Sequence, residues 1–221
     1  MTTAGSYERY YEEPNYFGYR EWLYRPYISS LLKAAGLGKG SSVLDVGCGQ
    51  GFFSSLLRRC GLSVYGLDLS EAGVRAAKHA WTSLDIHFLV ADIMDPPFAH
   101  AFDGVFARSL SLYNRDNFAS DRTVTDSLLK LVKPNGTLLF LYNTNLHRSK
   151  TSLSWRYHSV EDVRNHFSHY PNHQIFFSGK LDCLLLRRRA FSGPASTLNT
   201  FLSRTLGLGG DLVCILKPGS R

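Results

Sequence analysis

The chain has 221 residues, of which 44% are hydrophobic and 19% are charged, as in an ordinary globular protein. This length suits one α/β domain with a short extension. No stretch approaches the ~20 apolar residues of a membrane-spanning helix, and the four cysteines form no Cys-x-x-Cys pair. We therefore expect a cytoplasmic protein with no membrane association and no bound metal.

The chain is basic, with 25 lysines and arginines against 18 acidic residues and a net charge of +7. A basic balance raises the prospect of an anionic partner such as a nucleic acid. The basic residues are spread along the chain, however, and the densest run is only Arg187 to Arg189. A solvated surface explains that pattern equally well, so nucleic acid stays a disfavoured alternative.

The N-terminal segment is unusually aromatic. Residues 6–20 contain five tyrosines and one phenylalanine, too aromatic for a disordered tail and too polar for a core strand. Residues 20–35 then read as an amphipathic helix, with Trp22, Leu23, Tyr27, Leu31 and Ala34 at helical spacing. We expect residues 1–38 to form an aromatic lid and a helix that pack on a main domain of residues 39–221.

Strands and helices alternate through the middle of the chain. Strands are predicted at residues 43–46, 63–67, 86–90, 102–107 and 137–142, and helices at residues 52–60, 71–79 and 121–132. Further on, residues 160–169 and 196–206 read as helices, and residues 174–177 and 211–216 as strands. This alternation predicts βαβ units, a parallel sheet and right-handed crossovers that place helices on both faces.

The most informative segment runs from Val43 to Phe53, a strand followed by a glycine-rich turn and a helix. Glycines at positions 47, 49 and 51 let the backbone turn sharply and approach a ligand closely. Phe52 stands where a dinucleotide fingerprint has its third glycine, which disfavours a nicotinamide-dependent oxidoreductase.

Three aspartates follow the same strands. Asp45 lies inside the first strand, where a carboxylate either caps nearby backbone or faces a cationic or hydroxyl-bearing ligand. Asp68 ends the second strand about 20 residues after the turn, where an acidic side chain binds ribose hydroxyls. Asp92 follows the third strand and is placed to accept a hydrogen bond from an exocyclic amine, with Ile93 beside the base.

Five segments together resemble the successive motifs of the class I S-adenosylmethionine-dependent methyltransferases, over about residues 40 to 145. The resemblance implies a three-layer α-β-α sandwich with a seven-stranded, mostly parallel sheet in the order 3-2-1-4-5-7-6. Residues 211–216 would then be the antiparallel strand 7. The segments that carry it are residues 43–53, 66–68, 91–93, 102–106 and 128–138.

The same resemblance implies S-adenosylmethionine as the cofactor and gives roles to individual residues. Gly47, Gly49 and the backbone of Arg108 would approach its methionine part, and Asp45 would orient its amino group. Asp68 would hold the ribose hydroxyls. Asp92 would receive the adenine amine, with Leu69 and Ile93 against the ring.

The acceptor is less defined, because methyl transfer requires alignment more than a fixed catalytic motif. Residues 95–98, Asp-Pro-Pro-Phe, resemble the motif of amino-directed nucleic-acid methyltransferases but follow strand three instead of strand four, so we interpret them as a turn. We expect O- or N-methylation of a small molecule or glycan unit by a monomer or homodimer. An RNA or DNA methyltransferase and a non-catalytic cofactor-binding partner subunit are the alternatives.

Candidate acceptor-site residues come from the strand ends and the aromatic N-terminus. His147 and Tyr113 are the candidate catalytic residues, and Tyr16 is a candidate to cover the cofactor. The candidate substrate-binding residues are Tyr11, Tyr19, Asn114, Asn143 and His158.

Overall fold

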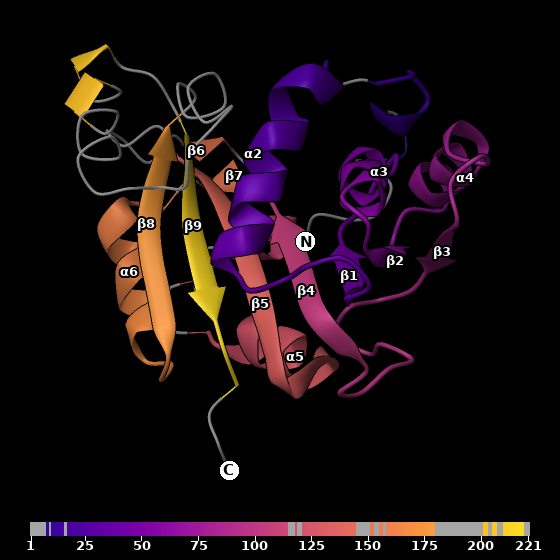
Figure 1. Ribbon diagram of the computed structural model, residues 1–221. Helices are drawn as coiled ribbons and strands as arrows, with labels where there is room; N and C mark the ends of the chain where they lie inside the picture. Colours follow the sequence, from indigo (N-terminus) through magenta and orange to yellow (C-terminus); the bar gives the residue numbers. More distant parts are fainter. Residues whose placement is uncertain are drawn as a thin grey trace.

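The computed structural model describes residues 8, 10–15, 17–114, 118, 121–144, 151–152, 155–156, 158–179, 201–202, 205–206 and 210–218. Its centre is a seven-stranded sheet in the order β3-β2-β1-β4-β5-β9-β8 (Figure 1). The strands are β1 (Ser42–Val46), β2 (Ser63–Asp68), β3 (Ile86–Val90), β4 (Phe102–Arg108), β5 (Val132–Thr144), β8 (His173–Gly179) and β9 (Gly210–Leu216).

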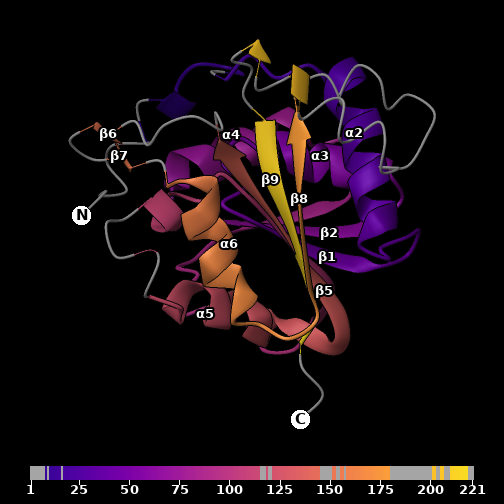
Figure 2. The same cartoon turned by 90° about the vertical axis from the view of Figure 1, so that its left-hand side faces the viewer.

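Helices cover both faces of this sheet, which makes three layers (Figure 2). Two short strands, β6 (Thr151–Ser152) and β7 (Trp155–Arg156), form a separate antiparallel pair. The helices are α2 (Glu21–Ala34), α3 (Phe52–Arg59), α4 (Glu71–Ala80), α5 (Thr123–Leu131) and α6 (Val160–Ser168), with a 3₁₀ turn η1 (Ser111–Asn114). In the described ranges, no helix is both long and apolar enough to cross a bilayer.

Each face of the sheet has its own apolar core. On one face, α2 and α3 pack against side chains such as Val43, Phe106 and Val213, all of which are fully buried. On the other face, α5 and α6 pack against Leu138, Phe140 and their neighbours. Burial on both faces explains why the central strands read as continuous apolar runs.

The predicted architecture is confirmed in strand order and direction. β1 to β5 run parallel, and β9 pairs antiparallel with both β5 and β8. Because β1 to β5 are parallel, their carboxyl ends meet at one edge of the sheet. The start of β9 lies at the same edge, because β9 runs antiparallel to β5. The predicted helix at residues 196–206 lies mostly outside the described residues.

Two local predictions differ from the structure. β5 begins at Val132 instead of residue 137, because Val132 already pairs with Phe102; the pairing resumes at Gly104 with Thr137, so residues 133–136 form an irregularity that the β4–β5 register skips. In α2 the buried residues are Tyr27, Ile28, Leu31 and Leu32, whereas Trp22 is 61% exposed. The first turn of α2 therefore lies at the surface of the molecule.

Buried hydrogen bonds connect η1, α5 and α6 on the face of the sheet that α5 and α6 cover. Nδ1 of His166 lies 3.0 Å from the carbonyl oxygen of Phe118, and Nε2 lies 2.9 Å from the Thr125 hydroxyl. The Tyr113 hydroxyl lies 2.7 Å from the same Thr125 oxygen. A carbonyl only accepts, so Nδ1 must carry the proton and Nε2 accepts in a neutral imidazole. Burial lowers the pKa of His166 below its usual value.

This lowered pKa predicts a stability that falls with acid. At His166 the folded state binds fewer protons than the unfolded state, so the contribution of this residue to the free energy of unfolding is at its full value above about pH 6.5 and declines as pH drops through its folded pKa. Urea denaturation of the wild-type protein and of His166→Gln between pH 7.5 and 5 separates this contribution from those of other titrating groups. The free energy of unfolding of the wild-type protein relative to that of the variant should fall as the pH drops, and a difference independent of pH would contradict the assignment.

Candidate cofactor and acceptor site

The turn between β1 and α3 depends on three glycines in the left-handed region. Gly47, Gly49 and Gly51 have φ of 73°, 49° and 76°. The N–H groups of Gly47 and Cys48 both donate to the carbonyl of Leu67, at 2.8 and 3.1 Å, which ties the turn to β2. A side chain at any of the three positions would be strained, so the backbone itself forms the surface here.

Asp68 joins this turn to the next one. Its Oδ2 accepts the N–H of Gly49 at 2.8 Å, and its Oδ1 accepts the N–H of Ser70 at 2.9 Å. The Ser70 hydroxyl in turn accepts from the N–H of Gly73 and caps α4, as its sequence position predicts. Burial raises the pKa of Asp68, while the N–H donors of Ser70, Gly49 and Leu69 oppose that rise.

Asp45 is the most deeply buried carboxylate of the site, with 2% of its surface exposed. The Ser54 hydroxyl on α3 donates to its Oδ2 at 2.5 Å. Burial raises the pKa of Asp45 to about 7, and the nearby charge of Asp68 contributes to the rise. The carboxyl group therefore changes its charge close to neutral pH.

The β3 end carries the remaining predicted cofactor residues. Asp92 is exposed, and its Oδ1 accepts the N–H of Met94 at 2.9 Å. Ile93 is buried, and Leu69 after β2 is 52% exposed. Because Asp68 pairs with Val90 in the β2–β3 register, these residues occupy one stretch of the sheet edge.

The N-terminal segment lies over the glycine turn. A Cβ on Gly49 would lie 2.8 Å from the Tyr11 hydroxyl oxygen. Nε2 of Gln50 donates to the carbonyl oxygens of Tyr11 and Glu13, at 3.1 and 2.7 Å. Sequence reasoning missed Gln50, whose only signal was its place between two turn glycines.

Glu8 fixes the same segment to α4. Its two carboxylate oxygens accept the Ser70 hydroxyl at 2.9 Å and the N–H of Ala72 at 3.2 Å. A carboxylate at a helix N-terminus is stabilised by the free N–H groups there. The contact also places a second negative charge beside Asp68, which contributes to its raised pKa.

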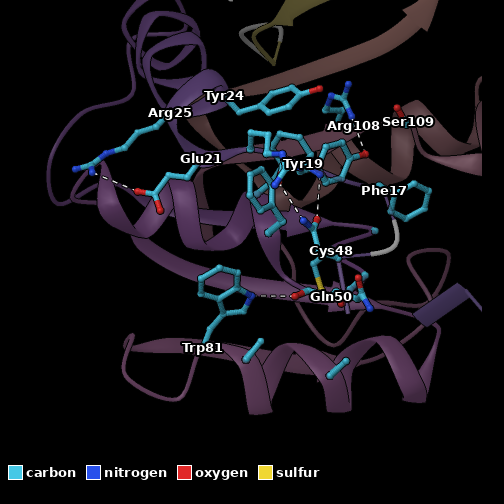
Figure 3. Close-up of a pocket in the computed structure, with 18 of the residues that line it drawn as sticks. Phe17, Tyr19, Glu21, Tyr24, Arg25, Cys48, Gln50, Trp81, Arg108 and Ser109 are labelled. Carbon is cyan, nitrogen blue, oxygen red and sulfur yellow. Dashed lines mark hydrogen bonds and ion pairs between the residues drawn. The ribbon is translucent and has the colours of Figure 1, made fainter. Parts of the chain in front are cut away.

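A cavity of about 1750 Å³ opens between this segment, α2 and the sheet edge (Figure 3). Ten of its 31 lining residues are Phe, Tyr or Trp and four are arginines, and Figure 3 shows Phe17, Tyr19 and Tyr24 grouped beside Arg108 and Ser109. The Nε1–H of Trp81 donates to the Gln50 carbonyl at 2.9 Å at the far side. Of the predicted site residues, the lining includes Tyr11, Tyr19, Gly47, Gly49, Arg108, Asn114 and Asn143.

Other predicted residues lie elsewhere. Asp68, Leu69, Asp92 and Ile93 stand outside the cavity lining, on the stretch of edge towards β3. Tyr16 and His147 lie outside the described residues.

Tyr113 and His158 are both buried away from the cavity. Tyr113 is 1% exposed, with its hydroxyl bound to Thr125 on the α5 side. Burial raises the pKa of Tyr113 well above its usual value. His158 is 5% exposed and lies with its ring 4.6 Å from that of Phe118.

Comparison with known proteins shows which family this sequence resembles. Residues 43–136 match the model of a family described as "Methyltransferase domain". The ubiquinone biosynthesis O-methyltransferase of Erwinia tasmaniensis is 32% identical over 118 residues, which are 52% of this chain and 46% of that protein. The malonyl-[acyl-carrier protein] O-methyltransferase of Erwinia pyrifoliae is 33% identical over 141 residues, 64% of this chain and 52% of that protein.

The matching family model, the sequence relatives and the shared fold together indicate a class I S-adenosylmethionine-dependent methyltransferase. This confirms the family that the motifs predicted. The matched regions span about half the length of these curated relatives.

Solved structures show the same fold of the class I methyltransferases over nearly the whole chain. Magnesium protoporphyrin IX methyltransferase of Synechocystis superposes with a TM-score of 0.61 at 16% identity, covering 98% of this chain and 92% of that one. A TehB-like methyltransferase of Corynebacterium glutamicum gives a TM-score of 0.58 at 14% identity, with 98% of both chains covered. At these identities the likeness concerns the fold alone.

Replacing glycines of positive φ by alanine should lower the stability to an extent that depends on the space around each glycine. A Cβ on Gly51 would lie 2.8 Å from Phe88 and 2.9 Å from Trp81, at a φ of 76°. Gly40 has a φ of 87° but open space around it, so Gly40→Ala carries the backbone strain alone. We expect Gly40→Ala to cost about 1–2 kcal/mol and Gly51→Ala about 1–3 kcal/mol more. Urea denaturation measures both, and equal losses would show that the crowding around Gly51 relaxes freely.

Proposed function

We propose that this methyltransferase moves a methyl group from S-adenosylmethionine to an oxygen or nitrogen of a small molecule or a glycan unit. The observation that supports it is the glycine turn, held open by Asp68 and bordering a large aromatic cavity. The O-methyltransferase relatives support an acceptor of this size and kind.

The residues at the sheet edge fit this cofactor. Gly47 is exposed, so its backbone is open to a close approach by a ligand. A Cβ added there would lie 3.0 Å from Leu110, so only a glycine leaves this approach free. Asp68 would bind the ribose hydroxyls and Asp92 the adenine amine, with Leu69 and Ile93 beside the ring. When bound, the cofactor supplies an activated methyl group on a sulfonium sulfur. In the described part of the chain, no cluster of three or more His, Cys, Asp or Glu side chains is arranged to hold a metal ion.

The protein's own contribution is alignment and exclusion of water. In an in-line transfer, a lone pair of the acceptor forms the bond to the methyl carbon while the carbon–sulfur bond breaks and sulfur keeps its electrons. A base is needed only where the acceptor must lose its proton early. We propose that residues 1–38 form an aromatic lid and a helix packed on the core, with Tyr11 over the glycine turn and Tyr19 in the acceptor wall. His147 stays a predicted base.

The alternatives are separated by simple measurements. A nucleic-acid acceptor predicts binding of mixed oligonucleotides that weakens steeply as salt rises. We expect no such salt-dependent binding, because ten Phe, Tyr and Trp side chains in the cavity suit the apolar body of a small molecule and outnumber the four arginines, Arg20, Arg25, Arg59 and Arg108. Turnover of labelled cofactor with any acceptor would exclude a non-catalytic partner subunit.

Asp68 provides the main test of cofactor binding. We expect Asp68→Ala to weaken binding of S-adenosylhomocysteine by about 1–3 kcal/mol, the range for leaving hydrogen-bonding groups unpaired. Isothermal titration calorimetry measures the affinity, and circular dichroism checks that the turn still folds. Asp85→Ala serves as the matched control, since Asp85 is an exposed carboxylate before β3. Equal affinities in both variants would remove the proposed ribose contact.

Asp45 predicts a proton release on cofactor binding. Its raised pKa, about 7, means that part of the carboxyl groups carry a proton at pH 7. The cofactor's ammonium group would lower that pKa and expel a fraction of a proton. Calorimetry at pH 7 in buffers of different ionisation enthalpy measures this number. Asp45→Asn should abolish the release, and a wild-type protein that exchanges no proton would contradict the placement of the ammonium group.

A further inference from the structure

Arg108 ends β4 with a side chain that is almost entirely buried, 9% exposed, in the wall of the cavity. Its Nη1 donates to the Tyr19 hydroxyl at 3.1 Å, and its Nη2 reaches Oδ1 of Asp211 at 3.4 Å. Within the described part of the chain, its buried Nε has no hydrogen-bond partner. A guanidinium has five N–H groups, of which Nη1 and Nη2 each use one here, so the donors left for a molecule in the cavity are the second hydrogens of Nη1 and Nη2 and not the enclosed Nε.

The ion pair with Asp211 is incomplete. Charge-assisted contacts between N–H and carboxylate oxygens are typically about 2.7–2.9 Å long, shorter than the 3.4 Å observed here. Asp211 also accepts from the Tyr27 hydroxyl at 3.3 Å, so its negative charge is shared. Burial disfavours the charge of Arg108, yet Asp211 and the surrounding tyrosines raise its pKa, so it stays a cation. A buried cation with unmet donors is costly unless another acceptor satisfies it.

Aromatic rings enclose the guanidinium. Its carbon lies 4.9 Å from the ring centre of Phe53, 5.6 Å from that of Tyr19 and 5.8 Å from that of Tyr24. Ring faces stabilise a cation but accept no strong hydrogen bond from its N–H groups. Figure 3 shows Arg108 beside Tyr19 and Tyr24, in the cavity wall.

The position of Arg108 points to the acceptor side of the cavity. Val46 pairs with Ala107, so the next residues, Gly47 and Arg108, come side by side at the sheet edge. The side chain then extends to Asp211 on β9, across β5 and away from β1. Asn143, which pairs with Asp211, lines the same part of the cavity.

We propose that Arg108 forms a carboxylate-binding subsite, and that the acceptor is an apolar or aromatic small molecule carrying a carboxylate. This inference rests on the proposed function for the identity of the reaction. The planar fork of a guanidinium matches the two oxygens of a carboxylate, and the surrounding rings match an apolar body. The carboxylate thereby holds the acceptor with its reacting atom towards Gly47 and the cofactor.

The test compares two probes with the same ring system. 2-Naphthoate carries the negative charge and 2-naphthamide does not, and both are titrated into the full chain saturated with S-adenosylhomocysteine. We expect the wild-type protein to bind the naphthoate at least about tenfold more tightly than the amide, as a charge-assisted contact implies. Arg108→Met should remove that difference and leave the affinity for the amide within about twofold. Arg75→Met on the exposed face of α4 is the matched control and should change neither affinity.

A second variant keeps the proposal testable if Arg108→Met fails to fold. Asp211→Asn removes the competing carboxylate but leaves the guanidinium, so the naphthoate should bind several-fold more tightly while the amide is unaffected. A purely structural ion pair would instead leave the preference for the charged probe unchanged or weaken both probes together.

Three results would overturn the proposal or its basis in distinguishable ways. Equal wild-type binding of both probes would remove the subsite while leaving methyl transfer intact. A loss of S-adenosylhomocysteine affinity in Arg108→Met, with probe selectivity retained, would show that the guanidinium serves the cofactor's own carboxylate instead. A wild-type protein that does not bind S-adenosylhomocysteine would contradict the proposed function itself.

Discussion

The geometry at the carboxyl ends of β1 and β2 depends on the carboxylate of Asp68. With two oxygens it accepts backbone N–H groups from two consecutive turns, that of Gly49 after β1 and that of Ser70 after β2. The glycines of the first turn and the cap of the second do not by themselves fix how the two turns are placed, because a glycine backbone without a hydrogen-bond partner can adopt other conformations. By joining them, Asp68 sets the spacing between the first two strand ends, and the segment carrying Glu8 and Tyr11 then docks on the surface so formed.

Much of this edge was predictable from sequence because it depends on backbone. Glycines at 47, 49 and 51 indicate a sharp turn and Ser70 indicates a helix start, so the sequence predicts where both turns lie, although their spacing depends on Asp68. Apolar runs of four to six residues predicted the central strands for a similar reason, since a strand buried on both faces has no polar alternation. The family motifs supplied the order of the strands, which local patterns do not encode.

Side-chain direction was the part that sequence did not determine. Tyr113 and Asn114 are neighbours after β4, yet Asn114 lines the cavity and Tyr113 points into the α5 side of the core. The predicted role of Arg108 concerned its backbone, whereas its side chain finds partners 89 and 103 residues away, in Tyr19 and Asp211. No local sequence pattern predicts contacts between segments so far apart in the chain. The same holds for Gln50, which reaches back 39 residues to Tyr11.

The partnership of Arg108 with Asp211 makes one wall of the cavity depend on two strands that lie far apart in the chain. β4 and β9 are both neighbours of β5, but β9 is the last of the seven strands along the chain. A chain truncated before β9 would keep the glycine turn and β4, yet the cation at the end of β4 would have no Asp211 carboxylate beside it. The glycine turn and the wall around Arg108 are therefore separable features, and only the wall requires the C-terminal strand.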